Sequence, residues 1–190
     1  HPDSQKIISS METNGSKVID MMMGSHDKQV VFFKNMTHHL MNLDRSFLNN
    51  TVNVILTRNP VEMLPSYAKV INNPSMDDVG YALQVDLLNY LNERDLNPLV
   101  IDSTKVLLNP EKELMYLCKR INIPFNDKML LWKPQPIKED GVWAKHWYKN
   151  IHKSEGFNKY KPKTEPFPMD LNALLESCIP CYDELMRFSN

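Results

Sequence analysis

The sequence predicts an α/β fold in which a mainly parallel sheet is flanked by helices. Three short apolar runs, residues 30–33, 52–57 and 99–101, each end at a polar residue. Segments with helical spacing of apolar residues lie between and after them, and such alternation is typical of parallel strands joined by helices. With 190 residues, of which 42% are hydrophobic, residues 1–190 are expected to form one domain with its own core.

The second apolar run leads into the clearest helix start. Arg58 ends the run, Asn59 is a favoured N-cap, and Pro60 suits the first helical position because its missing N–H would be unpaired there. The junction therefore brings a guanidinium together with the unpaired backbone N–H groups and the positive dipole end of a helix start, and such an arrangement binds phosphate or sulfate. The alternative is a purely structural junction in which Arg58 pairs with a local carboxylate such as Glu62.

Three further helices are predicted from apolar residues spaced three and four positions apart. They cover residues 81–91, 114–121 and 171–186. Asn109 and Pro110 give the second of these helices a strong start. Pro180 is expected to kink or split the last one.

Composition excludes several classes of protein. The net charge of −1 gives no reason to expect a nucleic-acid partner or binding to an anionic membrane, and no apolar run is long enough to cross a bilayer. Three cysteines do not suggest a disulfide framework and favour a reducing compartment, so we expect a cytoplasmic protein. No histidine, cysteine or carboxylate cluster has zinc-site spacing, and no metal is expected.

Residues 131–168 are rich in proline and lack periodicity, which predicts a long ordered loop. Within it, residues 133–163 contain eight lysines and three acidic residues, an excess of five positive charges. A run of this kind is either a solvated loop or a surface that attracts an anion.

Four motifs along the chain carry a resemblance to one known family of proteins, and they occur in the order of that family. Lys34 followed by His38 and His39 resembles a strand that ends in a lysine before a catalytic histidine. The segment from Arg58 to Ser66 resembles the element that holds the 3′-phosphate of the nucleotide. Residues 99–124 resemble the strand and helix that follow, and residues 140–147 resemble a late glycine–tryptophan loop. Together these motifs resemble the sulfotransferases, a family with a P-loop fold. The chain resembles more closely a sulfotransferase-like branch of that family, which also occurs fused to an aminotransferase-like half.

The resemblance implies transfer of a sulfuryl group from 3′-phosphoadenosine 5′-phosphosulfate to a hydroxyl or amine of a small molecule. Adenosine 3′,5′-bisphosphate would be the product. The residues that the family pattern assigns to the nucleotide are Arg58, Ser66, Lys138, Gly141 and Trp143.

The same resemblance implies the catalytic residues. Lys34 would neutralise charge on the transferring group, and His38 or His39 would be the general base. In an extended segment adjacent side chains point to opposite sides, so one of the two histidines is expected to face the site, and spacing favours His38. The alternative is that these histidines cap or pair within a loop.

The chain departs from the family in lacking a P-loop before the first motif. Its five glycines, at positions 15, 24, 80, 141 and 156, do not form a phosphate loop after a strand. The chain starts with His1 rather than methionine, and we expect it to be N-terminally incomplete. The alternative function is a non-catalytic binding or assembly module. Without the missing N-terminal segment, the chain is expected either to pair with a protein partner at the open N-terminal edge of the sheet or to be poorly soluble.

Overall fold

The computed structural model describes residues 3–137 and 139–189. The chain divides into two compact units, each built from two stretches of sequence. The sheet unit contains Lys34–Pro124 and Lys159–Asn190, and the smaller unit contains His1–Phe33 and Phe125–Asn158. The organisation of residues 1–190 as one domain stays a prediction.

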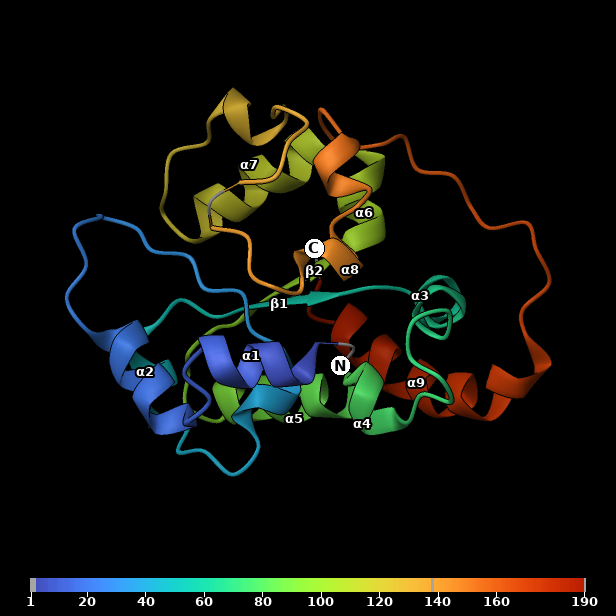
Figure 1. The fold of residues 1–190 in the computed structure, drawn as a ribbon, viewed down its shortest axis with the longest axis horizontal. Helices are drawn as coiled ribbons and strands as arrows, with labels where there is room; N and C mark the ends of the chain where they lie inside the picture. The colour runs from blue at the N-terminus through green and yellow to red at the C-terminus, as the bar shows by residue number, and fades with distance from the viewer. Residues whose placement is uncertain (1–2, 138, 190) are drawn as a thin grey trace. The chain divides into compact units, whose positions relative to one another are not determined.

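The sheet unit is built around two parallel strands, β1 (Val54–Thr57) and β2 (Leu99–Asp102) (Figure 1). The crossover between them runs through α3 (Pro60–Tyr67), α4 (Met76–Val79) and α5 (Tyr81–Asn92). Since the strands are parallel and paired along their length, both end at the same edge, which is where α/β folds bind ligands. The predicted α/β class is therefore confirmed, although the sheet is small.

The first of the three predicted strands is absent, so the prediction of a three-stranded sheet with Lys34 at its carboxyl edge is wrong. Residues 30–33 are irregular and exposed, with Phe32 84% accessible to solvent. A strand forms only where a neighbour pairs with its N–H and C=O groups. In the described part of the chain no such neighbour is paired with residues 30–33. Apolar composition alone did not create a strand.

The core of the sheet unit lies between the strands and two helices, α5 and α9 (Asn172–Met186). Leu88 of α5 and Leu185 of α9 are fully buried and belong to the same cluster as Ile55 of β1. In Figure 1 these helices lie along one side of the strands, and α6 (Ser103–Leu108) and α7 (Pro110–Arg120) lie on the other. Burying one such side chain contributes about 2 kcal/mol, so the cluster holds β1 firmly in position.

The predicted helix starts at Pro60 and Pro110 are confirmed. The side chain of Asn59 accepts a hydrogen bond from the Val61 N–H at 2.9 Å, and Asn109 caps α7 in the same way. Helix α9 continues through Pro180, so the split expected there does not occur. Burial of apolar side chains on both sides of Pro180 offsets the hydrogen bond that proline removes.

The smaller unit contains α1 (Ser4–Ser10), α2 (Gly15–Met23) and α8 (Ala144–Trp147). It also contains the short 3-10 turns η3 (Asp127–Met129) and η4 (Ile151–Lys153). Asp3 precedes α1, and its carboxylate pairs with Lys145 and His146 of α8. Hydrogen bonds from these two side chains lower the pKa of Asp3 to about 2, so this acid stays ionised across the physiological range.

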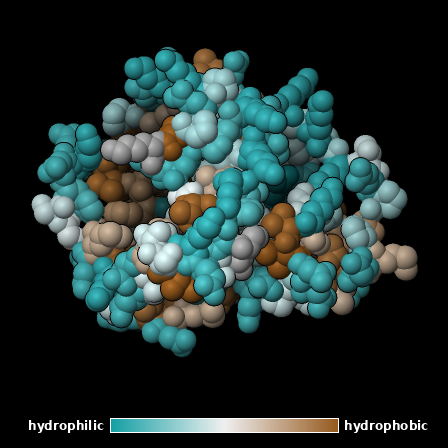
Figure 2. Space-filling model, viewed as in Figure 1, coloured by the Kyte–Doolittle hydropathy of each residue, from teal (hydrophilic) through white to brown (hydrophobic). Residues whose placement is uncertain are grey.

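The surface exposes several apolar side chains. Figure 2 shows apolar patches interspersed with hydrophilic side chains on the face in view. Val54 and Leu56, on the outward side of β1, are 38% and 61% exposed. Within residues 3–137 and 139–189, no helix combines the length and the apolar character needed to cross a bilayer.

Candidate functional site

The junction between β1 and α3 positions the two residues predicted to hold a phosphate. Arg58 follows β1 directly, and Ser66 lies in the last turn of α3. The hydroxyl of Tyr81 donates a hydrogen bond of 2.6 Å to the carbonyl oxygen of Arg58. Tyr81 is buried, and burial strongly raises its pKa, so it remains a protonated donor. The backbone of Arg58 is therefore fixed, while its side chain remains 41% exposed.

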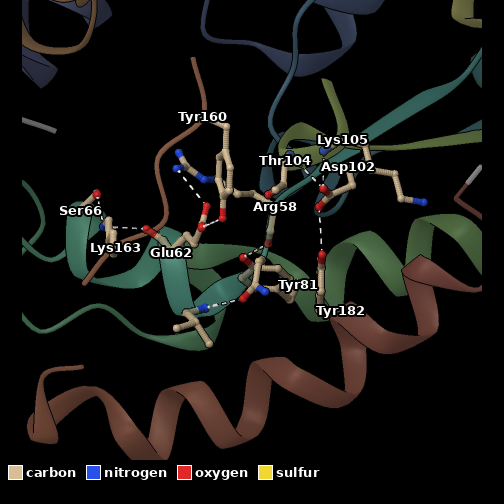
Figure 3. A network of polar contacts seen from close by, with 12 residues as sticks. Arg58, Glu62, Ser66, Tyr81, Asp102, Thr104, Lys105, Tyr160, Lys163 and Tyr182 are labelled. Carbon is tan, nitrogen blue, oxygen red and sulfur yellow. Dashed lines mark hydrogen bonds and ion pairs between the residues drawn. The ribbon is translucent and has the colours of Figure 1, made fainter. Parts of the chain in front are cut away.

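The guanidinium of Arg58 pairs with Glu62, as the structural alternative proposed. Nη2 lies 3.5 Å from Oε2 of Glu62, whose side chain is only 10% exposed. The hydroxyl of Tyr160 donates a hydrogen bond to the same carboxylate (Figure 3). This hydrogen bond, followed by burial, raises the pKa of Tyr160.

The ion pair leaves part of the guanidinium unused. Nε of Arg58 is buried and has no hydrogen-bond partner within the part of the chain that the structure describes. A guanidinium carries five N–H donors, and a buried donor without a partner is unfavourable. The Glu62 ion pair therefore does not use all the donors of Arg58, whose side chain is 41% exposed.

A lysine that the sequence did not single out joins this cluster. Nζ of Lys163 donates to the Ser66 hydroxyl oxygen at 2.7 Å and to the Glu62 carbonyl oxygen at 2.8 Å (Figure 3). Burial, followed by the nearby charge of Arg58, lowers the pKa of Lys163. The sequence signal that could have identified Lys163 is its position as the last lysine of the basic run 133–163. The structure thus gathers Arg58, Ser66 and Lys163 around Glu62.

The free backbone N–H groups expected at the start of α3 are already used. The Val61 N–H bonds to the side chain of Asn59, and the N–H groups of Glu62 and Met63 bond to the Asn59 carbonyl oxygen. Pro60 has no N–H to offer. Anion binding at this junction therefore depends on side chains, to which the helix adds only the field of its dipole.

The carboxyl end of β2 is closed by a structural network. Asp102 is 2% exposed, and its Oδ1 accepts hydrogen bonds from the N–H groups of Thr104 and Lys105 at 2.8 Å and 3.0 Å. Oδ2 accepts a third bond, of 3.0 Å, from the hydroxyl of Tyr182 in α9. Asp102 therefore caps α6 and links it to α9 (Figure 3).

The two predicted catalytic histidines lie in a 3-10 turn, η1 (Thr37–Leu40), and not in an extended segment. Their rings meet edge to face with centroids 4.7 Å apart, so the expected placement on opposite sides of a strand is wrong. Nδ1 of His39 accepts a long hydrogen bond of 3.4 Å from the Met36 N–H. Desolvation, then the charges of His38 and Lys34, lower the pKa of His39.

The remaining residues predicted to bind the nucleotide belong to the smaller unit, whereas Lys34 begins the sheet unit. A Cβ at Gly141 would collide with the indole ring of Trp143, so the close packing of these two residues requires glycine. The indole N–H of Trp143 donates to the Tyr148 hydroxyl at 3.4 Å. Lys138, the third predicted nucleotide residue of this loop, lies outside the described residues.

Comparison with known proteins adds a family to this geometry. Residues 1–188 match the family model described as "Sulfotransferase domain". The chain is 38% identical to branched-chain-amino-acid aminotransferase-like protein 1 of Arabidopsis thaliana and 35% identical to protein 2 of the same name, each over 186 residues. Each match covers 97% of this chain and 33% of the relative, so the chain spans about a third of the length of these curated relatives. No solved structure matches the chain.

Proposed function

Because the chain belongs to the sulfotransferase domain family, we propose that it binds 3′-phosphoadenosine 5′-phosphosulfate and that Arg58 and Ser66 hold the 3′-phosphate. The observation that carries this proposal is the buried Nε of Arg58, which has no partner among the described residues. It lies on a guanidinium that is fixed at the end of β1 and partly open to solvent. A phosphate oxygen would supply the missing acceptor through a charge-assisted hydrogen bond.

The nucleotide would supply the sulfuryl group for transfer to a hydroxyl or amine of a small-molecule acceptor. A histidine takes the acceptor proton as the new bond to sulfur forms and the bond from sulfur to the nucleotide phosphate oxygen breaks. Adenosine 3′,5′-bisphosphate then leaves. The positive charge of Lys34 stabilises the negative charge that develops on the transferring group.

His38 suits the role of general base better than His39. The bond from the Met36 N–H engages the lone pair on Nδ1 of His39, so a neutral His39 carries its proton on Nε2. Nε2, the ring nitrogen of His39 that is not engaged by the Met36 N–H, then already carries a proton and cannot accept another. We therefore assign the base to His38 and a supporting position to His39.

The second candidate is a non-catalytic binding or assembly module. Two observations favour this module. Lys34 follows an irregular segment and not a strand, and the guanidinium of Arg58 already forms an ion pair with Glu62. Such a module would retain the β1–α3 junction as a binding surface. It would lack transfer activity.

Two proposals concern the surroundings of the protein. The sequence has three cysteines, an odd number that does not suggest a disulfide framework and favours a reducing compartment, and we propose the cytoplasm. The exposed Val54 and Leu56 side chains are the ones that a protein partner at β1 would cover. Neither proposal depends on whether the protein is an active transferase.

Calorimetric titration with adenosine 3′,5′-bisphosphate tests the phosphate assignment, with adenosine 5′-monophosphate as the ligand that lacks the 3′-phosphate. Arg58→Ala should weaken bisphosphate binding by about 2 kcal/mol or more, since a charge-assisted contact is lost. Ser66→Ala should cost about 1 kcal/mol, since a neutral hydroxyl contributes one hydrogen bond. Binding should weaken as salt is added.

Matched variants separate the site from general effects. Arg187, at the C-terminal cap of α9, also forms an ion pair with a nearby glutamate, and Ser177 is another helical serine. Arg187→Ala and Ser177→Ala should therefore leave binding unchanged. If the wild-type protein binds the bisphosphate no better than the monophosphate, the phosphate role of Arg58 is wrong. Bisphosphate binding without sulfuryl transfer to any tested acceptor would favour the module.

A further inference from the structure

Lys163 occupies a position that neither the family pattern nor the sequence assigned. It lies in the irregular segment before η5 (Met169–Leu171), 97 residues from Ser66 along the chain. Two of its three N–H bonds are directed at α3, to Ser66 and to the Glu62 carbonyl oxygen. Because the residue is exposed overall, a ligand can reach the third N–H from solvent.

The bond from Lys163 changes what Ser66 can do. A helical serine usually donates its hydroxyl hydrogen to the carbonyl four residues earlier, which here is that of Glu62. That carbonyl instead accepts from Lys163, and Ser66 itself accepts from the same ammonium. Among the residues that the structure describes, no acceptor bonds to the Ser66 hydroxyl hydrogen. With Lys163 in this position, the Ser66 hydroxyl can donate its hydrogen to a further acceptor.

The charges around Lys163 favour a multiply charged anion. The positive charges of Arg58 and Lys69 lower the pKa of Lys163, and the negative charges of Glu62 and Glu165 raise it. Glu62 is shared with Arg58 and Tyr160, which leaves it less able to neutralise the ammonium. A phosphate bearing two negative charges would relieve the repulsion between Lys163 and Arg58.

We propose that Lys163 is a third ligand of the bound phosphate, together with Arg58 and Ser66, and that it orients the Ser66 hydroxyl toward that phosphate. The identity of the ligand as the 3′-phosphate of a nucleoside bisphosphate rests on the proposed function. The segment that carries Lys163 then forms one wall of the anion site. This role differs from that of a structural link, which would hold the segment against α3 without contributing to binding.

Calorimetry with adenosine 3′,5′-bisphosphate and adenosine 5′-monophosphate tests this role. Lys163→Gln should weaken bisphosphate binding about tenfold, because one charge-assisted contact is lost, and should reduce its salt dependence. Binding of the monophosphate should change less than about twofold by the same reasoning, because that ligand lacks the 3′-phosphate. Lys161→Gln, which removes an exposed lysine from the same segment, should change neither affinity.

A second measurement uses the wild-type protein alone and does not depend on how the variant folds. Acetylation of each lysine is followed by mass spectrometry with and without the bisphosphate. The ligand should slow acetylation of Lys163 but not of Lys161. Equal rates with and without ligand, or unchanged affinity in a folded Lys163→Gln, would show that Lys163 is only a structural link.

The outcomes also separate this inference from the proposed function. If Arg58→Ala weakens binding and Lys163→Gln does not, the proposed function stands and the role of Lys163 is wrong. If the wild-type protein does not distinguish the two nucleotides, both are wrong.

Discussion

Replacing the buried carboxylate of Glu62 should strengthen anion binding. Glu62→Gln keeps an oxygen to accept the hydrogen bond from Tyr160 but removes the negative charge that holds Arg58. Nη2 of Arg58 lies 3.5 Å from Oε2 of Glu62, so a phosphate on the same guanidinium would lie about 6 Å from that carboxylate. Coulomb repulsion over this distance is about 3 kcal/mol per unit charge at an effective dielectric constant of about 20, and about 0.7 kcal/mol in water.

Because Arg58 is 41% exposed, the lower part of this range applies. We expect Glu62→Gln to bind adenosine 3′,5′-bisphosphate about fivefold more tightly, which corresponds to about 1 kcal/mol. Calorimetric titration at several salt concentrations measures the change, and the gain should shrink as salt rises. Glu113→Gln is the matched control, because Glu113 is as buried as Glu62 but lies in α7 and outside the cluster. Weaker binding by a folded Glu62→Gln would refute the reasoning, because it would mean that the carboxylate organises the site rather than competing for Arg58.

Two further predictions concern stability and protonation. Asp102→Ala should lower the free energy of unfolding in urea by about 2–3 kcal/mol, because it removes a helix cap and leaves the part-buried Tyr182 hydroxyl without its acceptor. Asp102→Asn should cost less, and equal losses for the two variants would contradict the role of Asp102 as a cap. By NMR, His39 should titrate below the ordinary value of 6.5, and Lys34→Met should raise its pKa. Because the folded state binds the His39 proton less readily than the unfolded state, its contribution to stability is present above pH 6.5 and is lost as the pH falls through the lowered pKa. A His39 pKa at or above 6.5 would contradict the desolvation seen at η1.

Local sequence patterns predicted the β1–α3 junction well. Asn59 and Pro60 specify the helix start through their own side chains, and the structure places the cap and the first helical residue where expected. The same holds for Asn109 and Pro110 at α7. These features depend on residues two or three positions apart, so the sequence contains the information in one place.

The apolar run at residues 30–33 was misread for a physical reason. Its composition matches that of β1, but a strand depends on a neighbour that composition does not reveal. The histidines were misplaced for a related reason, because their geometry was derived from the assumption that they follow this strand. Their observed place in η1 follows from a tight turn that residue type alone does not specify.

The candidate site was predicted only in part because its contacts are distant in sequence. Arg58, Glu62 and Ser66 lie on one strand–helix junction, and their association could be predicted from their spacing. Tyr160 and Lys163 approach the same junction from about a hundred residues further along the chain. The basic run was consistent with either a solvated loop or an anion-binding surface, and only the fold selects Lys163 from its eight lysines.

A crystal structure of the protein with adenosine 3′,5′-bisphosphate tests the phosphate site most directly. We expect oxygens of the 3′-phosphate within hydrogen-bonding distance of the Arg58 guanidinium and the Ser66 hydroxyl, with Nε of Arg58 no longer unpaired. A bisphosphate bound elsewhere, with Arg58 still held only by Glu62, would contradict the assignment and leave Arg58 as part of a structural ion pair.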